Sequence, residues 1–226
     1  MNSTDLGNRI IYEDNHLLVV DKLAGELVQG DATGDADILM LAKAYIGTKY
    51  NKPGKVFTGL PHRLDRPTSG VVVLCRTSKA LTRVAGMFRE REVDKTYHCL
   101  VEGKMQSKEG ELKHHLKKDG KLNKSFVSKQ SDAKLAHLAF RCIKEFNHYS
   151  LLEIKLFTGR HHQIRAQLSA IGHPIKGDVK YGAKRSNKHK NFCLHAYSLT
   201  MVHPTTNEQM TFTSNANTLS DWGMEK

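Results

Sequence analysis

The stretch Pro61–Cys75, PHRLDRPTSGVVVLC, joins three kinds of sequence in one short segment. A charged loop, His62–Arg66, is followed by turn-forming and small residues, Pro67–Gly70, and then by the apolar run Val71–Cys75. The β-branched residues of this run predict a buried strand. Because functional residues concentrate on loops that a rigid scaffold positions, Asp65 is a candidate reactive acid. Taken alone, however, an Asp beside Arg in a turn is more often a turn former or half of a surface ion pair.

Around this stretch the sequence predicts more strands than helices, with no internal repeat or low-complexity linker. The expected strands are Arg9–Glu13, His16–Asp21, Lys95–Glu102, Glu111–Leu116, Lys124–Lys129, Ala133–Lys144, Tyr149–Phe157, Leu194–Val202 and Gln209–Thr213. The expected helices are Ala36–Tyr50, one from Thr77 or Ser78 to about Glu90, and one that follows Thr158–Arg165 to about Ile171. This pattern predicts an α+β fold with a mostly antiparallel sheet and flanking helices, in a single domain spanning residues 1–226.

Composition and charge narrow the class of partner. Of the 226 residues, 39% are hydrophobic and 26% are charged, which argues against wholesale disorder. The formal net charge of +12 favours a polyanionic partner, with nucleic acid first and an anionic membrane second. The most basic run, Lys104–Gln130, is expected to form a surface hairpin with a turn at Asp119–Gly120. A hairpin that contacts phosphate and a merely solvated loop both fit this run.

The cysteines and the N-terminus indicate a cytoplasmic protein. Cys75, Cys99, Cys142 and Cys193 are far apart and form no CxxC pair, so we expect reduced core residues. The N-terminus has no basic start followed by an apolar stretch, and no apolar run approaches the roughly 20 residues that a membrane span needs.

Several motifs together resemble one enzyme family. The string HRLDRPTSG closely resembles the catalytic motif of the RluA-type RNA pseudouridine synthases, and Leu156–Gly182, LFTGRHHQIRAQLSAIGHPIKGDVKYG, resembles their second conserved region. Lys95–Gly103 and Ile11–Gly25 resemble two further elements, in the family's order. Leu23 stands where the family usually has Pro, and Gln167 where it usually has His. The resemblance covers most of the chain and implies the pseudouridine synthase fold with a catalytic cleft.

This resemblance implies isomerisation of uridine in RNA to pseudouridine, with neither a cofactor nor a metal. Asp65 is then the essential carboxylate, whether it attacks C1′, adds to the base or removes a proton from C2′ on the way to a glycal. Arg165, the arginine of HQIR, is expected to keep that carboxylate ionised, because a nearby opposite charge lowers an Asp pKa. Tyr97 is expected to pack on the excised uracil, and its hydroxyl is a candidate for moving a proton.

The remaining implied site residues bind the substrate. The target uridine must leave its helix, at a cost of a few kcal/mol. Arg63 is expected to fill the vacancy, with a simple phosphate contact as the alternative. Leu64 is expected to shape the pocket, while Arg160 and His162 complete the substrate-binding set. A structural or phosphate-binding role is expected for Arg66.

Neighbouring residues are expected to shape the backbone around these side chains. His162 and Gln163 are expected to tie their loop to its own backbone. Gly159 is expected to permit a tight entry into the helix, and Thr68–Gly70 to shape the turn before the strand.

Two alternative functions would require a different set of residues. A metal-dependent phosphodiesterase would need a cluster of carboxylates and histidines, but the spacing of His161, His162, His173 and His195 fits no zinc module, and adjacent histidines on a helix point in different directions. A catalytically silent RNA-binding protein of the same fold would be expected to lose Asp65, Tyr97 or Arg165, and all three are present.

The expected partner is RNA, either rRNA or tRNA, with no membrane, and the expected state is a monomer. Because the first strand begins near Ile10, no room is expected for an N-terminal RNA-binding module of the S4 type.

Overall fold

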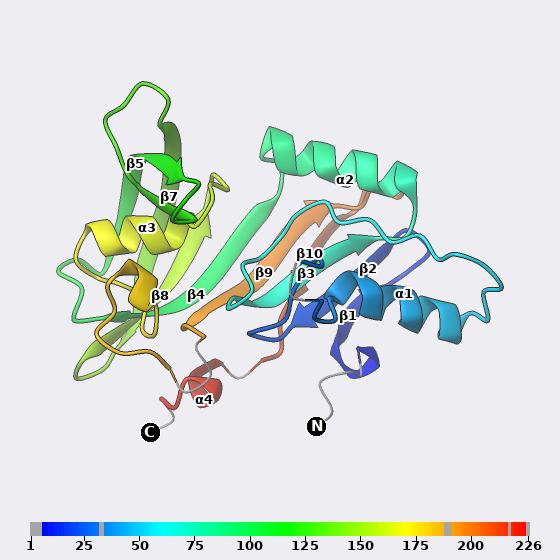
Figure 1. Ribbon diagram of the computed structural model, residues 1–226, viewed down its shortest axis with the longest axis horizontal. Helices are drawn as coiled ribbons and strands as arrows, with labels where there is room; N and C mark the ends of the chain where they lie inside the picture. Colours follow the sequence, from blue (N-terminus) through cyan, green and yellow to red (C-terminus); the bar gives the residue numbers. More distant parts are fainter. Residues whose placement is uncertain (1–5, 32–33, 188–190, 217, 225–226) are drawn as a thin grey trace. The chain divides into compact units, whose positions relative to one another are not determined.

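The computed structural model describes residues 6–31, 34–187, 191–216 and 218–224 (Figure 1). Ala32 and Thr33, which precede the first predicted helix, lie outside the described residues. The chain forms two compact units: unit 1 comprises Met1–Val93 and Ala196–Lys226, and unit 2 comprises Asp94–His195. The chain therefore leaves unit 1 once, builds unit 2 without interruption, and returns.

The sheet of unit 1 is built around the predicted buried strand. Its strands are β1 (Ile10–Glu13), β2 (Leu17–Lys22), β3 (Ser69–Cys75), β9 (Leu194–Val202) and β10 (Gln209–Thr213). They follow the order β1-β2-β3-β9, with β10 on β9, and the first two residues of β9 belong to unit 2. The β1–β2, β2–β3 and β9–β10 ladders are antiparallel.

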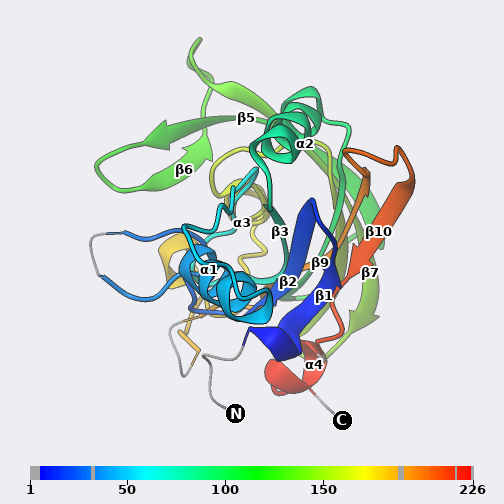
Figure 2. The same ribbon diagram turned by 90° about the vertical axis from the view of Figure 1, so that its right-hand side faces the viewer.

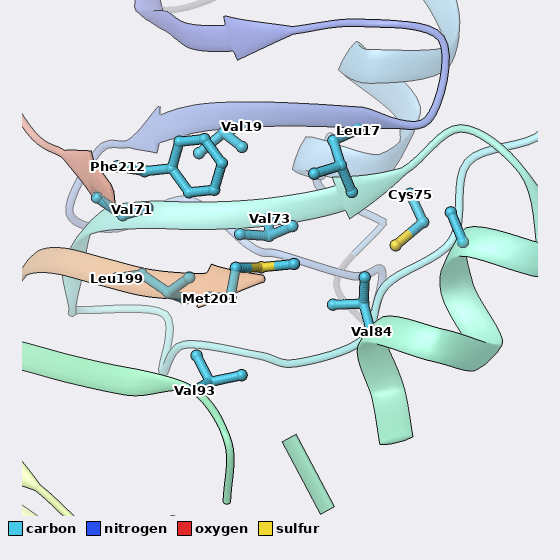
Figure 3. Packing of buried hydrophobic residues seen from close by; sticks show 11 residues of the cluster. Leu17, Val19, Val71, Val73, Cys75, Val84, Val93, Leu199, Met201 and Phe212 are labelled. Atoms are coloured by element: carbon cyan, nitrogen blue, oxygen red, sulfur yellow. The ribbon is translucent and has the colours of Figure 1, made fainter. Parts of the chain in front are cut away.

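Both faces of β3 are buried, which explains its uninterrupted apolar sequence. Side chains alternate between the faces of a strand. Val71, Val73 and Cys75 therefore join one cluster, which also holds Leu17 and Val19 of β2, while Val72 and Leu74 join another. Figure 3 shows the first cluster, where Phe212 and Met201 complete the apolar contact.

One helix covers each face of this sheet (Figure 2). Helix α1 (Ile38–Lys49) buries Ile38, Ala42 and Ile46, and helix α2 (Ser78–Glu90) buries Ala80 and Val84. Both helices begin at a side-chain cap. The Asp37 carboxylate accepts a hydrogen bond from Met40 N, and the Thr77 hydroxyl accepts one from Ala80 N. Short helices η1 (Gly7–Arg9) and α4 (Thr218–Asp221) complete unit 1.

Unit 2 is an antiparallel sheet with one helix. The strands β4 (Asp94–Glu102), β8 (Tyr149–Leu156), β7 (Lys134–Glu145), β5 (Glu109–Asp119) and β6 (Lys124–Val127) lie in this order. Helix α3 (Gln163–Ala170) contacts β5 and β6, and the short helix η2 (Val179–Tyr181) follows it. A small apolar cluster, formed by Leu116, Ala136, Ala166 and Tyr181, joins the helix to the sheet.

The predicted α+β fold with a mostly antiparallel sheet is confirmed, while the single domain stays a prediction. Two local expectations were wrong. The left-handed backbone before α3 is at His162, with φ +51°, whereas a Cβ at Gly159 would meet nothing within 4 Å. Cys142 is only half-buried, unlike the other three cysteines, because it lies near the irregular end of the β7–β8 ladder.

Candidate active site

The loop that carries Asp65 lies directly before β3 in unit 1. The Asp65 side chain is half-buried, Arg63 is exposed, and Leu64 packs partly buried against the apolar cluster under α1. The loop closes on itself through a hydrogen bond from Thr68 N to the Asp65 carbonyl, 3.0 Å long. Asp65 thus begins a short turn, and the neighbouring candidates Arg63 and Leu64 lie directly before it.

Side chains on either side of this turn hold it to the sheet. His62 Nε2 accepts a hydrogen bond from Val73 N at 3.0 Å, and its ring stacks on Phe88 with the centroids 4.5 Å apart. Arg66 donates to the Gly25 carbonyl at 2.9 Å and pairs with Asp35 at 2.6 Å. Arg66 therefore has the structural contacts that were expected of it.

A buried lysine binds backbone carbonyl groups of this turn. Lys22, at the end of β2, has no exposed surface, and its ammonium donates to the carbonyls of Leu23, Arg66 and Thr68 at 3.0, 2.9 and 2.6 Å. These three bonds use all three donors of an ammonium group. Burial lowers the pKa of Lys22 to about 7, against the opposing attraction of the Glu26 and Asp65 carboxylates.

The other two expected catalytic residues belong to unit 2. Tyr97 is half-buried on β4, in register with Ile154 of β8. Arg165 is on α3 and is 6% exposed. Its guanidinium makes a bidentate ion pair with Asp178, from Nε to Oδ2 at 2.6 Å and from Nη2 to Oδ1 at 2.9 Å. The centroids of the Tyr181 and Phe192 rings lie 4.7 and 4.4 Å from the guanidinium carbon, so cation–π contacts also help to hold the guanidinium in place.

A hydrogen-bond chain leads from His162 to strand β6. Tyr181 Oη accepts a hydrogen bond from Ser125 N at 2.7 Å, so its own proton faces His162 Nδ1, 2.9 Å away. Burial, and next the Arg165 charge, lower the pKa of His162 to about 3, so the imidazole is neutral at pH 7. A neutral imidazole accepts at one nitrogen, which matches a Tyr181 hydroxyl that donates to Nδ1.

The adjacent histidine rings contradict the expected divergence. His161 and His162 stack with the centroids 3.8 Å apart, because the left-handed backbone at His162 turns its side chain back over the preceding one. His161 also lies 2.9 Å from Ser125 Oγ and 3.1 Å from Asn123 Oδ1. The basic β5–β6 hairpin is therefore attached to the start of α3.

Gln163 ties its loop to the backbone as expected. Its Oε1 accepts from Thr158 Oγ1 at 2.8 Å and from Arg160 N at 2.9 Å, and its Nε2 donates to the His137 carbonyl at 3.1 Å. Arg160 donates through Nε to the Leu135 carbonyl at 3.0 Å. Arg160 as a whole is half-exposed.

Among the described residues, no group of three or more His, Cys, Asp or Glu side chains is placed to hold a metal ion. In the same part of the chain, no helix is both long enough and apolar enough to cross a membrane.

The prediction from sequence missed Lys22, Asp178 and Tyr181. Lys22 ends an apolar strand, where a lysine is normally expected to reach solvent, and Asp178 and Tyr181 lie between the last predicted helix and the strand predicted from Leu194, where no element was expected. The only available signal was that the GDVKYG string, which contains the last two, forms part of the motif resemblance.

Comparison with known proteins gives one family. The family model for RNA pseudouridylate synthases matches residues 16–170. tRNA pseudouridine synthase C of Vibrio parahaemolyticus is 33% identical over 220 residues, covering 89% of this chain and 87% of the relative. Ribosomal large subunit pseudouridine synthase D of Zymomonas mobilis is 32% identical over 225 residues, covering 92% and 69%.

A solved structure supports the same fold. Human RNA Pseudouridylate Synthase Domain Containing 4 has a TM-score of 0.80 at 22% identity, covering 98% of this chain and 95% of that one. The sequence motifs, the sheet and the family match agree, and the chain belongs to the RNA pseudouridylate synthases, the enzymes that isomerise uridine in RNA to pseudouridine.

Proposed function

We propose that Asp65 is the catalytic carboxylate of this pseudouridine synthase, and that it acts on one uridine together with Tyr97 and Arg165. The reaction breaks the N1–C1′ bond, turns the uracil and rejoins it through C5, and this chain's residues supply the charge and the proton path without a cofactor or a metal. In this proposal Arg165 keeps Asp65 ionised and Tyr97 packs on the detached base.

The observation that carries the proposal is the set of hydrogen bonds that hold the backbone on both sides of Asp65 in place. A catalytic carboxylate must be held in place while charge develops on the sugar and base. Lys22 binds the carbonyls of Arg66 and Thr68, immediately after Asp65, while His62 anchors the other side of the loop to β3. A simple surface turn would not need a fully buried ammonium group.

The geometry around Arg165 supports its assigned role. Asp178 and two aromatic rings fix the guanidinium, and the neutral His162 beside it adds no competing positive charge. Substrate contacts then fall to Arg63, Leu64, Arg160 and His162. Arg63 is exposed two residues before Asp65, which suits a side chain that enters the vacancy left by the flipped uridine.

We further propose that the substrate is a structured rRNA or tRNA. The relatives named above are a tRNA enzyme and a large ribosomal subunit enzyme, so both classes are supported. The two units are proposed to work as a single domain, because the family match runs from residue 16 to residue 170 and so draws on both. The enzyme is proposed to act as a cytoplasmic monomer.

Replacement of Asp65 by Asn tests the catalytic proposal. The variant keeps the size and shape of the side chain and is expected to abolish pseudouridine formation while RNA binding survives. Deletion of the gene, followed by mapping of pseudouridines across total RNA, names the substrate as the uridine that stays unmodified. Retained turnover in the Asp65→Asn enzyme would remove Asp65 from the mechanism.

A further inference from the structure

A cavity of about 520 Å³ opens in unit 2, at the end of β4. Its walls come from the end of β4, from the turn between β7 and β8, and from the segments before and after η2. The side chains that give it chemical character are Lys176, Lys184, Arg185, Tyr149, Asn147 and Asn187. We call this cavity the Lys176 pocket. Its volume lies within the range of about 300–1,000 Å³ that is typical of small-ligand sites.

The charge of the Lys176 pocket sets it apart from two other cavities. Its lining holds three cations, Lys176, Lys184 and Arg185, against one carboxylate, so its formal charge is +2. A cavity beside α2 holds one arginine against two glutamates, and a cavity on β5, β7 and β8 holds two cations against three glutamates, so each has a formal charge of −1. A pocket with this charge selects an anion.

The pocket is built by hydrogen bonds within unit 2. Gly103 N donates to the His148 carbonyl at 2.8 Å, Lys176 N donates to the Leu100 carbonyl at 2.8 Å, and Lys184 N donates to Glu102 Oε1 at 3.0 Å. The last bond also holds the only carboxylate of the lining in place, and the three cations outnumber it.

Two further contacts fix the side chains of the pocket. The Lys176 ammonium lies 5.2 Å from the centroid of the Tyr149 ring, a cation–π contact that positions its charge. Asn187 packs on Gly177 so closely that a Cβ there would lie 2.6 Å from Asn187 Nδ2. The wall that carries Lys184 and Arg185 is therefore held against the segment that carries Lys176.

The pocket lies well away from Tyr97, the residue that is proposed to contact the reacting base. Glu102 and Tyr97 are on the same strand, and at about 3.4 Å per residue they lie about 17 Å apart along it. A group held in the pocket is then too far from Tyr97 to be the reacting base. It is close enough to belong to the same bound strand.

We propose that the Lys176 pocket binds a nucleotide of the RNA strand that flanks the reacting uridine, and that Lys176, Lys184 and Arg185 hold its phosphate. The inference rests on the proposed function, in which Tyr97 contacts the reacting uracil. Free nucleotides carry the same phosphate chemistry, and RNA is the source we infer because the chain belongs to an RNA-modifying family.

The test is a charge-removal variant with a matched control. K184Q/R185Q removes two exposed cations from the pocket, and K43Q/K52Q removes two exposed cations of unit 1 that the pocket does not include. Binding of a fluorescein-labelled oligocytidylate, which has no uridine to react, is measured against salt for the wild type and both variants. Unfolding midpoints of the three proteins check that the fold is kept.

We expect the pocket variant to bind at least tenfold more weakly at low salt, while the control changes less than twofold. The slope of log K against log salt should fall by about 0.7 for each phosphate contact that is lost. Equal weakening in the two variants would overturn the proposal, because it would show a general effect of charge.

A second arm separates the two sources of phosphate. Uridine 5′-monophosphate and inorganic phosphate are titrated by calorimetry. Mononucleotide binding that K184Q/R185Q abolishes, with oligocytidylate binding unchanged, would assign the pocket to a free nucleotide and overturn the RNA assignment. In pseudouridine formation the pocket variant should raise KM much more than it lowers kcat. Failure of the catalytic proposal would appear instead as turnover by the Asp65→Asn enzyme.

Discussion

Arg165 and Asp178 form a bidentate ion pair inside unit 2, with N–O distances of 2.6 and 2.9 Å and with 6% and 2% of the residues exposed. Burial of two charges costs several kcal/mol of desolvation for each ion, and only close geometry recovers it. The chain therefore keeps a costly pair at the residue that the proposed mechanism needs as a fixed cation. A free arginine side chain would not stay in one orientation.

Removal of one partner of this ion pair should strongly lower the stability of the fold. We expect Asp178→Asn to lower the free energy of unfolding by about 3–5 kcal/mol, because it leaves the Arg165 charge buried without its counterion. The double variant R165M/D178L should lose less than D178N alone, since both charges leave together. Urea unfolding measures both effects.

The exposed pair Arg89–Glu90 serves as the control for that experiment, with side chains 76% and 62% exposed. Arg89→Met should change stability by less than about 1 kcal/mol. A comparable loss at the two pairs would show that burial does not set the cost.

Lys22 should make stability depend on pH. Its pKa is about 7 in the folded protein and about 10.5 in the unfolded chain, so the unfolded chain binds more protons between these values. The contribution of Lys22 should therefore rise as pH increases from about 7 to 10.5. The difference in unfolding free energy between the wild type and Lys22→Met, measured in urea across this range, should grow by a few kcal/mol. A difference that stays constant would contradict the lowered pKa of Lys22 in the folded protein.

Gly70 should tolerate no side chain. Its φ is +111°, and a Cβ would lie 2.2 Å from the Ala196 carbonyl oxygen, where β3 meets β9. Gly172 has φ +84° with nothing within 4 Å of its Cβ position. A substitution there therefore measures the cost of the left-handed backbone alone, without a steric clash. Gly172→Ala should cost about 1–2 kcal/mol. Thermal unfolding should show a loss at Gly70→Ala that is larger by at least about 1–3 kcal/mol, from the steric clash. Equal losses for the two variants would mean that β9 moves away from the new Cβ at position 70.

Substitutions of Tyr97 should separate its ring from its hydroxyl. If packing on uracil is the main contribution, Tyr97→Phe keeps kcat within about tenfold, while Tyr97→Leu loses far more. Proton transfer by the hydroxyl would instead make the Phe variant slower by roughly 10²–10⁴-fold. Single-turnover rates of pseudouridine formation at saturating RNA distinguish these results.

The elements that bury apolar surface were predictable, because their signals are local. The run Val71–Cys75 predicts β3, and Thr77 predicts the start of α2, since a strand buried on both faces and a capped helix each depend on adjacent residues. The motifs likewise identify Asp65, Tyr97 and Arg165 as candidates from the sequence alone.

The supports of the site were not predictable, because they depend on contacts between distant residues. The carbonyls around Lys22 come from residues up to 46 positions away. The stacking of His161 on His162 depends on one left-handed backbone conformation that a histidine adopts only occasionally. A sequence pattern carries neither kind of information.

Unit 1 is formed by two separate segments of the chain, so the ribosome completes its sheet in two stages. Residues 94–195 leave the ribosome as one uninterrupted segment, and β3 must wait through its synthesis until β9 is translated. At roughly 5–20 residues per second, the roughly 120 residues between β3 and β9 impose a delay of about 6–24 s. During that interval one edge of the nascent sheet is open, and the apolar face that Leu199, Met201 and Phe212 later cover is a natural site for chaperone capture.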